Sequence, residues 1–219
     1  MSSSPKQAVY EQLARIGKAL STPARLEILE LLAQAERSVD ALARLTGLTV
    51  ANTSQHLQLL RQVGLVTSRR EGQFIFYRLA GDQVVTLIGS LGRVGETYVA
   101  EVGKLLQTFF TAQDEIEPVP AKELHKKARK GLVTVIDLRP FEEYAAGHVP
   151  GAINIPLPEL QKRMRDLPKG KEIVAYCRGP YCLMSFTAMK MLRGRGHKAR
   201  RLEAGLPEWR SAGLPVQTD

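Results

Sequence analysis

Both cysteines of this chain, Cys177 and Cys182, lie in the seven-residue stretch Tyr-Cys-Arg-Gly-Pro-Tyr-Cys at positions 176–182. The run before it, residues 172–176, is apolar enough to form a buried strand. A Gly-Pro turn follows, and the segment 184–192 then has the pattern of a helix. The sequence therefore predicts a strand–loop–helix unit in which Cys177 ends the strand and Cys182 precedes the helix.

This position has chemical consequences for Cys177. Backbone N–H groups of the loop, the N-terminus of the helix and the neighbouring Arg178 all favour the anionic form of a thiol. We therefore expect Cys177 to be an accessible thiolate of low pKa, and hence a nucleophile that reacts before Cys182. The alternative is a structural disulfide or a pair of inert core thiols.

Two further segments flank the cysteine loop. Residues 133–137 precede the run Arg-Pro-Phe-Glu-Glu-Tyr-Ala-Ala-Gly-His-Val-Pro-Gly-Ala-Ile-Asn-Ile-Pro at 139–156, and Gly-Leu-Pro-Glu-Trp-Arg-Ser-Ala-Gly-Leu-Pro-Val lies at 205–216. With the loop, they resemble the rhodanese (sulfurtransferase) superfamily over about residues 118–219. The resemblance implies an α/β domain with a parallel sheet, in which Cys177 carries a sulfane sulfur as a persulfide. It also implies a loop that cradles the persulfide, with the candidate site residues Cys177, Arg178, Gly179, Tyr181 and Cys182.

Loop length separates this interpretation from related folds that act as phosphatases or arsenate reductases. Those loops have the form Cys-x5-Arg, whereas the sixth residue after Cys177 is Leu183. No guanidinium is then placed to bind a phosphate or arsenate in bidentate fashion. The departure from the common rhodanese pattern is Cys182, which closes the loop and suggests a second role for the cysteine pair.

Composition places the chain in a broad class. At 219 residues it can form one large domain or two domains of about 100 residues, each with its own core. No stretch approaches 18 consecutive apolar residues, and the N-terminus lacks the apolar segment of a secretory signal. Two cysteines in one loop do not make an extracellular disulfide framework. We expect a cytoplasmic protein with no membrane partner.

Charge is distributed unevenly over the net +9 of the chain. Residues 1–117 carry 12 basic and 12 acidic side chains, whereas residues 118–219 carry 19 and 10. A basic C-terminal surface would suit anionic sulfur donors, although solvated lysines explain it equally well. In the N-terminal half, residues 37–79 hold six arginines against two acids.

That arginine-rich segment has the pattern of a winged helix-turn-helix. Apolar spacing predicts helices at 26–32 and 39–45, and Gly47 provides the turn between helices. Thr49 is expected to cap a helix over 50–63 that buries Val50, Leu57, Leu60 and Val63. Strands at 65–68 and 74–79 follow, joined by Arg69-Arg-Glu-Gly-Gln as an arginine-tipped wing. The side chains expected to contact bases or phosphates are Asn52, Ser54, Gln55, His56, Gln58, Arg61, Arg69 and Arg70.

Residues 10–80 resemble the ArsR/SmtB family of bacterial repressors, above all in Ser-Gln-His-Leu-Gln-Leu-Leu-Arg-Gln-Val-Gly-Leu-Val at 54–66. The resemblance implies a homodimer that binds double-stranded operator DNA and leaves it when an inducer binds. Many metal-sensing members carry Cys-x-Cys where this chain has Ser38 and Asp40. The four histidines are scattered, so we expect no metal site and no cofactor.

Residues 82–113 form a third feature, with apolar residues at spacings of three and four. We expect one helix on the order of 45 Å long, at about 1.5 Å per residue, which outruns so small a domain. A dimer interface is therefore favoured over packing on its own domain. Its predicted residues are Ile88, Leu91, Tyr98, Val102, Leu105 and Phe109.

The sequence thus predicts a DNA-binding and dimerisation domain (1–113), a linker (114–120) and a rhodanese-like domain (121–219). We expect a repressor that senses sulfane sulfur from polysulfide, a low-molecular-weight persulfide or thiosulfate. The Cys177 thiolate would attack the donor. The resulting persulfide would either stay among the N–H groups of the loop or be attacked by Cys182 to give a disulfide or a sulfur-inserted bridge. Two alternatives stay open: an active sulfurtransferase beside an independent DNA-binding domain, and a peroxide switch through a Cys177–Cys182 disulfide.

Overall fold

The structure is a computed structural model that describes residues 4–110, 116–168 and 170–219. It contains two compact units, Met1–Val84 and Val85–Asp219. The end of the predicted long helix (111–113) and the start of the predicted linker (114–115) lie outside the described residues. The first unit combines helices with a small antiparallel sheet, and the second has an α/β fold. Both agree with the fold classes predicted from the sequence.

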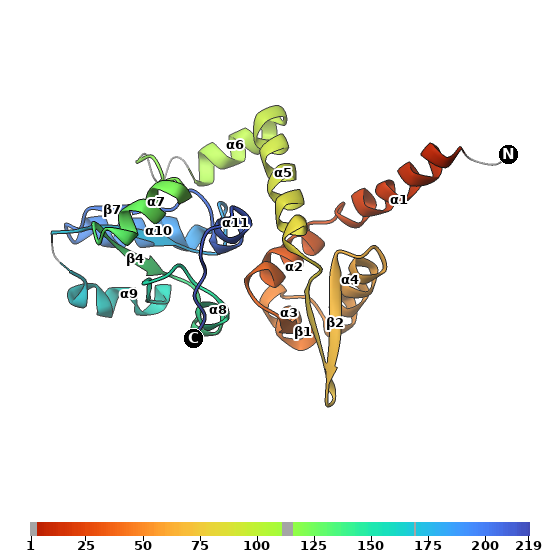
Figure 1. Ribbon diagram of the computed structural model, residues 1–219, viewed down its shortest axis with the longest axis horizontal. Coiled ribbons are helices and arrows are strands. Elements are labelled where there is room, and N and C mark those ends of the chain that lie inside the picture. Colours follow the sequence, from red (N-terminus) through yellow and green to blue (C-terminus); the bar gives the residue numbers. More distant parts are fainter. Residues whose placement is uncertain (1–3, 111–115, 169) are drawn as a thin grey trace. The chain divides into compact units, whose positions relative to one another are not determined.

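The first unit is a helical domain with a β-hairpin (Figure 1). Strand order in its antiparallel sheet is β1-β3-β2. Its elements are α1 (Pro5–Ala19), α2 (Pro23–Gln34), β1 (Arg37–Ser38), α3 (Val39–Thr46), α4 (Val50–Gln62), β2 (Val66–Glu71) and β3 (Phe74–Leu79).

Local sequence signals set the ends of α3 and α4. Ser38 caps α3 by accepting a hydrogen bond from the N–H of Ala41, and Thr49 caps α4 in the same way from Asn52. Gly47, with a φ of 68°, ends α3 in the left-handed conformation that glycine adopts without strain. These caps confirm the predicted helix-turn-helix boundaries.

The core of the first unit consists of one face of each of α2, α3 and α4 packed against the sheet. Buried residues include Ile28, Leu29, Leu42, Leu57, Leu60 and Tyr77. Two predicted core residues are not buried: Val50 is 50% exposed, and Val63 is only partly covered. They are the first residue of α4 and its C-cap, so they lie at the helix ends, where little of the domain can pack against them.

The predicted single helix over 82–113 is wrong. Two helices occur instead, α5 (Asp82–Tyr98) and α6 (Ala100–Phe109), separated by Val99 in an extended conformation. Glycines at 89, 92 and 95 and β-branched residues at 97 and 99 lower the helix propensity of this stretch. The apolar spacing continues through the break, which is why periodicity alone did not reveal it.

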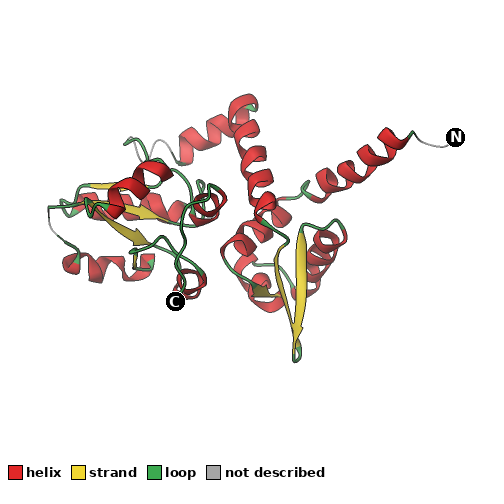
Figure 2. Cartoon of the chain, viewed as in Figure 1, coloured by secondary structure: helices red, strands yellow, loops and turns green. Residues whose placement is uncertain are grey.

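The second unit contains a four-stranded parallel sheet with helices around it (Figure 2). Strand order is β5-β4-β6-β7, so β4 and β6 are central. Beyond α5 and α6, its elements are α7 (Ala121–Arg129), β4 (Val133–Asp137), α8 (Phe141–Ala146), β5 (Ile153–Asn154), α9 (Leu157–Arg163), the 3-10 helix η2 (Met164–Asp166), β6 (Glu172–Tyr176), α10 (Leu183–Gly194), β7 (Ala199–Arg201) and α11 (Leu206–Ser211).

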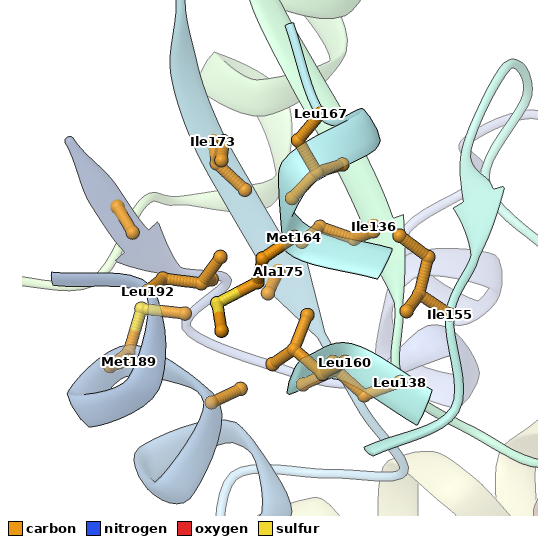
Figure 3. Packing of buried hydrophobic residues seen from close by; sticks show 12 residues of the cluster. Ile136, Leu138, Ile155, Leu160, Met164, Leu167, Ile173, Ala175, Met189 and Leu192 are labelled. Carbon is orange, nitrogen blue, oxygen red and sulfur yellow. The ribbon is translucent and has the colours of Figure 1, made fainter. Parts of the chain in front are cut away.

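Both faces of this sheet are covered, so its central strands β4 and β6 are buried along almost their whole length. Successive side chains of a strand point to opposite faces, and the two clusters divide accordingly. Figure 3 shows one cluster, in which Ile136 and Ile173 meet Leu160 of α9 and Met189 of α10. The other cluster contains Val135, Val174, Leu124 of α7 and Trp209 of α11.

A buried ion pair lies at the carboxyl end of β4. The Arg139 guanidinium donates to the Asp137 carboxylate at 2.6 Å, and both side chains are fully buried. Arg139 also donates to the backbone carbonyl of Gly147 at 2.7 Å, and its guanidinium lies over the Tyr176 ring. The pair therefore joins β4, the segment after α8 and the last residue of β6, directly before Cys177.

Candidate functional site

The exposed face of α4 carries most of the residues predicted to contact DNA. Asn52, Gln55, Gln58 and Arg61 are exposed. Ser54 and His56 are partly buried, whereas Leu57 and Leu60 turn into the core. The helix thus presents hydrogen-bonding side chains of the types that recognise base edges and phosphates.

The wing differs from its prediction in two respects. Arg69 and Arg70 lie within β2, and only Gly72 and Gln73 separate the two strands. Arg69 pairs with the carboxylates of Glu36 and Glu71, and these hydrogen bonds raise the pKa of its guanidinium. Arg70 donates to the carbonyl of Gly72 at 3.1 Å instead. The involvement of Glu36, which precedes β1, could not be read from the sequence because it depends on the fold.

The residues predicted for dimerisation lie on α5 and α6. Leu91, Tyr98, Leu105 and Phe109 are exposed, and Tyr98 is 80% exposed. Ile88 and Val102 are partly buried. Helix α1 presents a further apolar set, Val9, Tyr10 and Leu13, each more than half exposed. Large apolar side chains are thus solvent-exposed on three helices.

The cysteine loop runs from the end of β6 to the start of α10, as predicted. Cys177 directly follows β6 and is 2% exposed, whereas Cys182 is the N-cap residue of α10 and is partly exposed. The two cysteines are not joined by a disulfide, and their thiols are hydrogen-bonded to each other. The backbone N–H of Cys182 donates to the carbonyl of Gly179 at 3.2 Å, which closes the turn.

The prediction of an accessible, low-pKa Cys177 is wrong for this state of the loop. The hydrogen bond with Cys182 and the burial of the thiol raise the pKa of Cys177 well above its usual value. The backbone N–H and the guanidinium of Arg178 act in the opposite direction, and their effect is smaller. Burial opposes charge on any thiol, and the strand position alone did not show how deeply this one lies.

A second ion pair, partly buried, holds Arg178, the residue after Cys177. Its guanidinium binds both carboxylate oxygens of Glu143, with donor–acceptor distances from 2.7 to 3.1 Å. Glu143 belongs to α8 and its side chain is fully buried. Glu143 was not among the residues predicted for the site, although it lies in the 139–156 run. Bidentate pairing of this kind fixes the direction of the guanidinium and thereby the start of the loop.

Gly205, the N-cap residue of α11, touches the cysteine loop from the other side. A Cβ atom built on it would overlap the carbonyl group of Arg178 and the N–H of Gly179. Its φ of −99° is ordinary, so the requirement for glycine here is steric. The Gly205 N–H donates to the Glu208 carboxylate at 2.9 Å, and burial raises the pKa of that carboxyl group.

Tyr181 reaches from the loop to α5 within the second unit. Its hydroxyl donates to the Glu96 carboxylate at 2.6 Å. Desolvation and this hydrogen bond raise the pKa of the phenol. Phe110, which follows α6, lies edge-on to the rings of Tyr181 and Phe186. Tyr181, the residue next to Cys182, is therefore in contact with α5 and with Phe110 at the end of α6. These are two of the helices that carry the exposed apolar side chains described above.

Across residues 4–110, 116–168 and 170–219, three or more His, Cys, Asp or Glu side chains are nowhere grouped as metal ligands. Within the same ranges, every helix is too short or too polar to cross a membrane.

Comparison with known protein families assigns both halves. The family described as "Bacterial regulatory protein, arsR family" matches residues 22–68. The family described as "Rhodanese-like domain" matches residues 120–212, which include β4, the cysteine loop and α11.

Individual relatives agree with this division. The chain is 44% identical over 211 residues to the HTH-type transcriptional regulator Rv0324 of Mycobacterium tuberculosis, covering 96% of this chain and 92% of the relative. It is 32% identical over 84 residues to a sulfurtransferase of Allochromatium vinosum, covering 38% of this chain and 78% of that protein. A solution structure of the homodimeric winged helix-turn-helix domain of Mb0332 from Mycobacterium bovis is 43% identical, covers 45% of this chain and 92% of its own, and has a TM-score of 0.42. The chain therefore belongs to the HTH-type transcriptional regulators of the ArsR family and carries a rhodanese-like domain after its winged helix-turn-helix.

Proposed function

We propose that this regulator is a homodimeric repressor that binds operator DNA and senses sulfane sulfur through Cys177 and Cys182. The observation that carries the proposal is a pair of reduced, hydrogen-bonded thiols inside a rhodanese-like loop. Vicinal thiols can exchange with sulfane sulfur and end as a bridged, oxidised pair. The donors we consider are polysulfide, low-molecular-weight persulfide and thiosulfate.

Helix α5 supplies a physical route from the loop to the DNA-binding unit. It begins at Asp82, within the first unit, and continues to Tyr98, within the second. Glu96 on this helix accepts the hydrogen bond of Tyr181, whose neighbour is Cys182. Bridging the two cysteines would move Tyr181 and weaken that bond. A tenfold change in operator affinity requires a coupling free energy of about 1.4 kcal/mol.

Operator binding with and without a sulfur donor tests the proposal. With DNA selected from a random pool for tight binding, polysulfide should weaken wild-type binding at least about tenfold. The double variant Cys177→Ser/Cys182→Ser should bind DNA normally and not respond. If both forms respond alike, the cysteine pair is not the sensor and the proposal fails.

The same samples distinguish the two alternatives by mass spectrometry and sulfide release. An independent sulfurtransferase would turn over a donor and an acceptor thiol while DNA affinity stays constant. A peroxide switch would respond to hydrogen peroxide at far lower concentration than to polysulfide. The proposed sensor responds to polysulfide first and changes its DNA affinity when it does.

The DNA interface gives a prediction about salt dependence. Arg70→Ala should lower the slope of log K against log salt by about one, because one phosphate contact is lost. Arg69→Ala should change it less, since Glu36 and Glu71 already neutralise that guanidinium. Fluorescence anisotropy from low to moderate salt measures both slopes. Arg165→Ala, on the second unit, is the control and should leave the slope unchanged.

Base recognition gives a second readout from the same assay. Gln55→Ala should cost about 1–3 kcal/mol on the selected operator and much less on random DNA. Equal losses on both kinds of DNA would assign Gln55 to the phosphate backbone rather than to a base.

The exposed apolar side chains of α5 and α6 predict a dimer. Leu91→Glu combined with Leu105→Glu should convert the dimer to monomers, because two carboxylates would then be buried at the interface. Sedimentation velocity at micromolar concentration measures the change. Leu132→Glu, at an exposed leucine that lies outside these helices, should remain dimeric. A folded wild-type monomer under these conditions would contradict the prediction.

A further inference from the structure

A large part of the basic charge of the second unit lies at the opposite end of its sheet from the cysteine loop. The loop follows the carboxyl end of β6, whereas α7 and α10, which run back along the sheet, end near the amino ends of the strands. Lys127 of α7 accordingly pairs with the first residue of β6 at 3.4 Å. Lys162, Arg165, Arg195 and His197 line a cavity of about 510 Å³ beyond the end of α10.

This basic end of the sheet is too distant to set the potential at the cysteines. Strand β6 has five residues, so its two ends are about 17 Å apart at about 3.3 Å per residue. Salt screens exposed charges over about 8 Å under physiological conditions. The basic excess of the C-terminal half therefore contributes little to the attraction of anions to the loop.

The charges around the cysteine loop itself are mainly negative. Arg178 is the one basic residue of the loop, and both carboxylate oxygens of the buried Glu143 bind it. The hydroxyl of Tyr181 donates to the Glu96 carboxylate. Desolvation, this hydrogen bond and the charges of Glu96 and Glu208 raise the pKa of the Tyr181 phenol. The carboxylates that keep this phenol neutral disfavour any other anion at the same edge of the loop.

Glu96 reaches the loop from outside the rhodanese-like domain. It belongs to α5, whereas the rhodanese-like match covers residues 120–212. Arg93, one turn earlier on α5, donates to the Ser90 hydroxyl at 2.9 Å, and the partner of the Glu96 carboxylate is the Tyr181 hydroxyl. The helix before the domain thus supplies a negative charge beside the residue that precedes Cys182.

We propose that the cysteine loop selects its sulfur donor by charge, and that Glu96 is a specificity-determining residue. The loop accepts low-molecular-weight hydropersulfides, R–S–S–H, whose R group is uncharged, and it discriminates against dianionic donors such as thiosulfate. This inference rests on the proposed sensing function and names its donor class. Glu96 acts on the charge of the donor through space and does not touch the reacting sulfur.

The selected reaction transfers one sulfur to Cys177. The thiol ionises, its thiolate forms a bond to the terminal sulfur of R–S–S–H, the S–S bond of the donor breaks, and R–S⁻ leaves and takes up the proton. The sum is one thiol and one hydropersulfide giving Cys177–S–S–H and R–S–H. A dianion in the loop opposes the ionisation of Cys177, whose pKa the hydrogen bond with Cys182 and burial already raise.

Two hydropersulfides that differ chiefly in the charge of R test this selection. The R group from 2-mercaptoethanol is uncharged, and the one from mercaptosuccinate carries two carboxylates. The full chain with Cys182→Ser keeps the added sulfur on Cys177, so mass spectrometry follows its uptake. Relative to the rates of the same donors with free cysteine, uptake from the uncharged donor should be about tenfold faster or more. Added salt should accelerate only the dianionic donor. Equal relative rates would overturn the proposal.

Variants of the Tyr181–Glu96 pair separate charge from structure in the same Cys182→Ser chain. Glu96→Gln keeps an acceptor for the Tyr181 hydroxyl, and it should accelerate the dianionic donor about three- to tenfold and the uncharged donor less than about twofold. Tyr181→Phe removes the hydrogen bond, keeps the carboxylate and should show no such selective effect. Equal acceleration of both donors by Glu96→Gln would refute selection by charge and leave the sensing function intact. Absence of sulfur uptake from either donor would refute the sensing function and this inference with it.

Discussion

Asp137→Ala is expected to lower the free energy of unfolding of the second unit by about 3–5 kcal/mol, because it leaves the fully buried Arg139 guanidinium without its counter-charge. Burial of an ion pair gives little net stability by itself, but removal of one partner exposes the whole desolvation cost of the other. Urea unfolding followed by tryptophan fluorescence measures the loss. The chain has one tryptophan, Trp209, which is fully buried in the second unit, so the signal reports on that unit alone.

A matched control separates burial from the mere loss of an acidic side chain. Asp166→Ala also removes a carboxylate near an arginine, but Asp166 and Arg165 are 67% and 86% exposed. Exposed pairs contribute about 0–1 kcal/mol, so this variant should unfold close to the wild type. If the two variants were equally stable, the Asp137–Arg139 pair would not support the carboxyl end of β4 in the way its burial implies.

Gly205→Ala is expected to displace the cysteine loop. The new methyl group would overlap the backbone of Arg178 and Gly179, and backbone atoms cannot move aside as flexible side chains do. Overpacking of this kind costs about 1–3 kcal/mol. The larger effect should be chemical, because a shifted loop separates the thiols and exposes Cys177. We expect iodoacetamide to alkylate Cys177, which trypsin releases in the peptide 172–178, about tenfold or more faster than in the wild type, and the polysulfide response to be lost.

Gly194→Ala provides the comparison for that experiment. Gly194 is the last residue of α10, has no atom near the position of an added Cβ and lacks a positive φ. Its replacement should leave both thiols at their wild-type rates and unfold no more easily than the wild type, since alanine favours a helix. If Gly205→Ala left the alkylation rate of Cys177 and the polysulfide response unchanged, the loop would accommodate a methyl group against the Arg178–Gly179 peptide. The steric requirement for glycine at this position would then be contradicted.

Most helices and strands could be predicted from the sequence, because the interactions that form them are local. The strand over 172–176 and the helix after it appear as predicted, and so do the caps at Thr49 and Gly47. The alternation of apolar residues in strands, their spacing in helices and the capping hydrogen bonds all involve residues a few positions apart. Residues that interact in these ways are therefore also close together in the sequence. The wing was predicted as a hairpin for the same reason, with its turn misplaced by a few residues.

The chemistry of the loop was not readable, because it depends on residues distant in sequence. Arg178 is held by Glu143, and the loop backbone is fixed by Gly205. The burial of Cys177 results from packing around a central strand, and this reverses the expected effect on its pKa. Similarly, Arg69 looked available for DNA because its partner Glu36 lies 33 residues away.

The parallel sheet of the second unit has a consequence for synthesis of the chain. Parallel strands are joined by crossover connections, so β4 can pair with β6 only after the residues between them have been synthesised. β7, the last strand in the sequence, joins the sheet last. The first unit contains a tight hairpin between β2 and β3, and it leaves the ribosome earlier, at about 5–20 residues per second. A nascent or prematurely terminated chain therefore acquires its winged helix-turn-helix before its cysteine loop exists. Such products would carry the exposed face of α4 but not the cysteine pair, so under the proposed function they would not respond to sulfane sulfur.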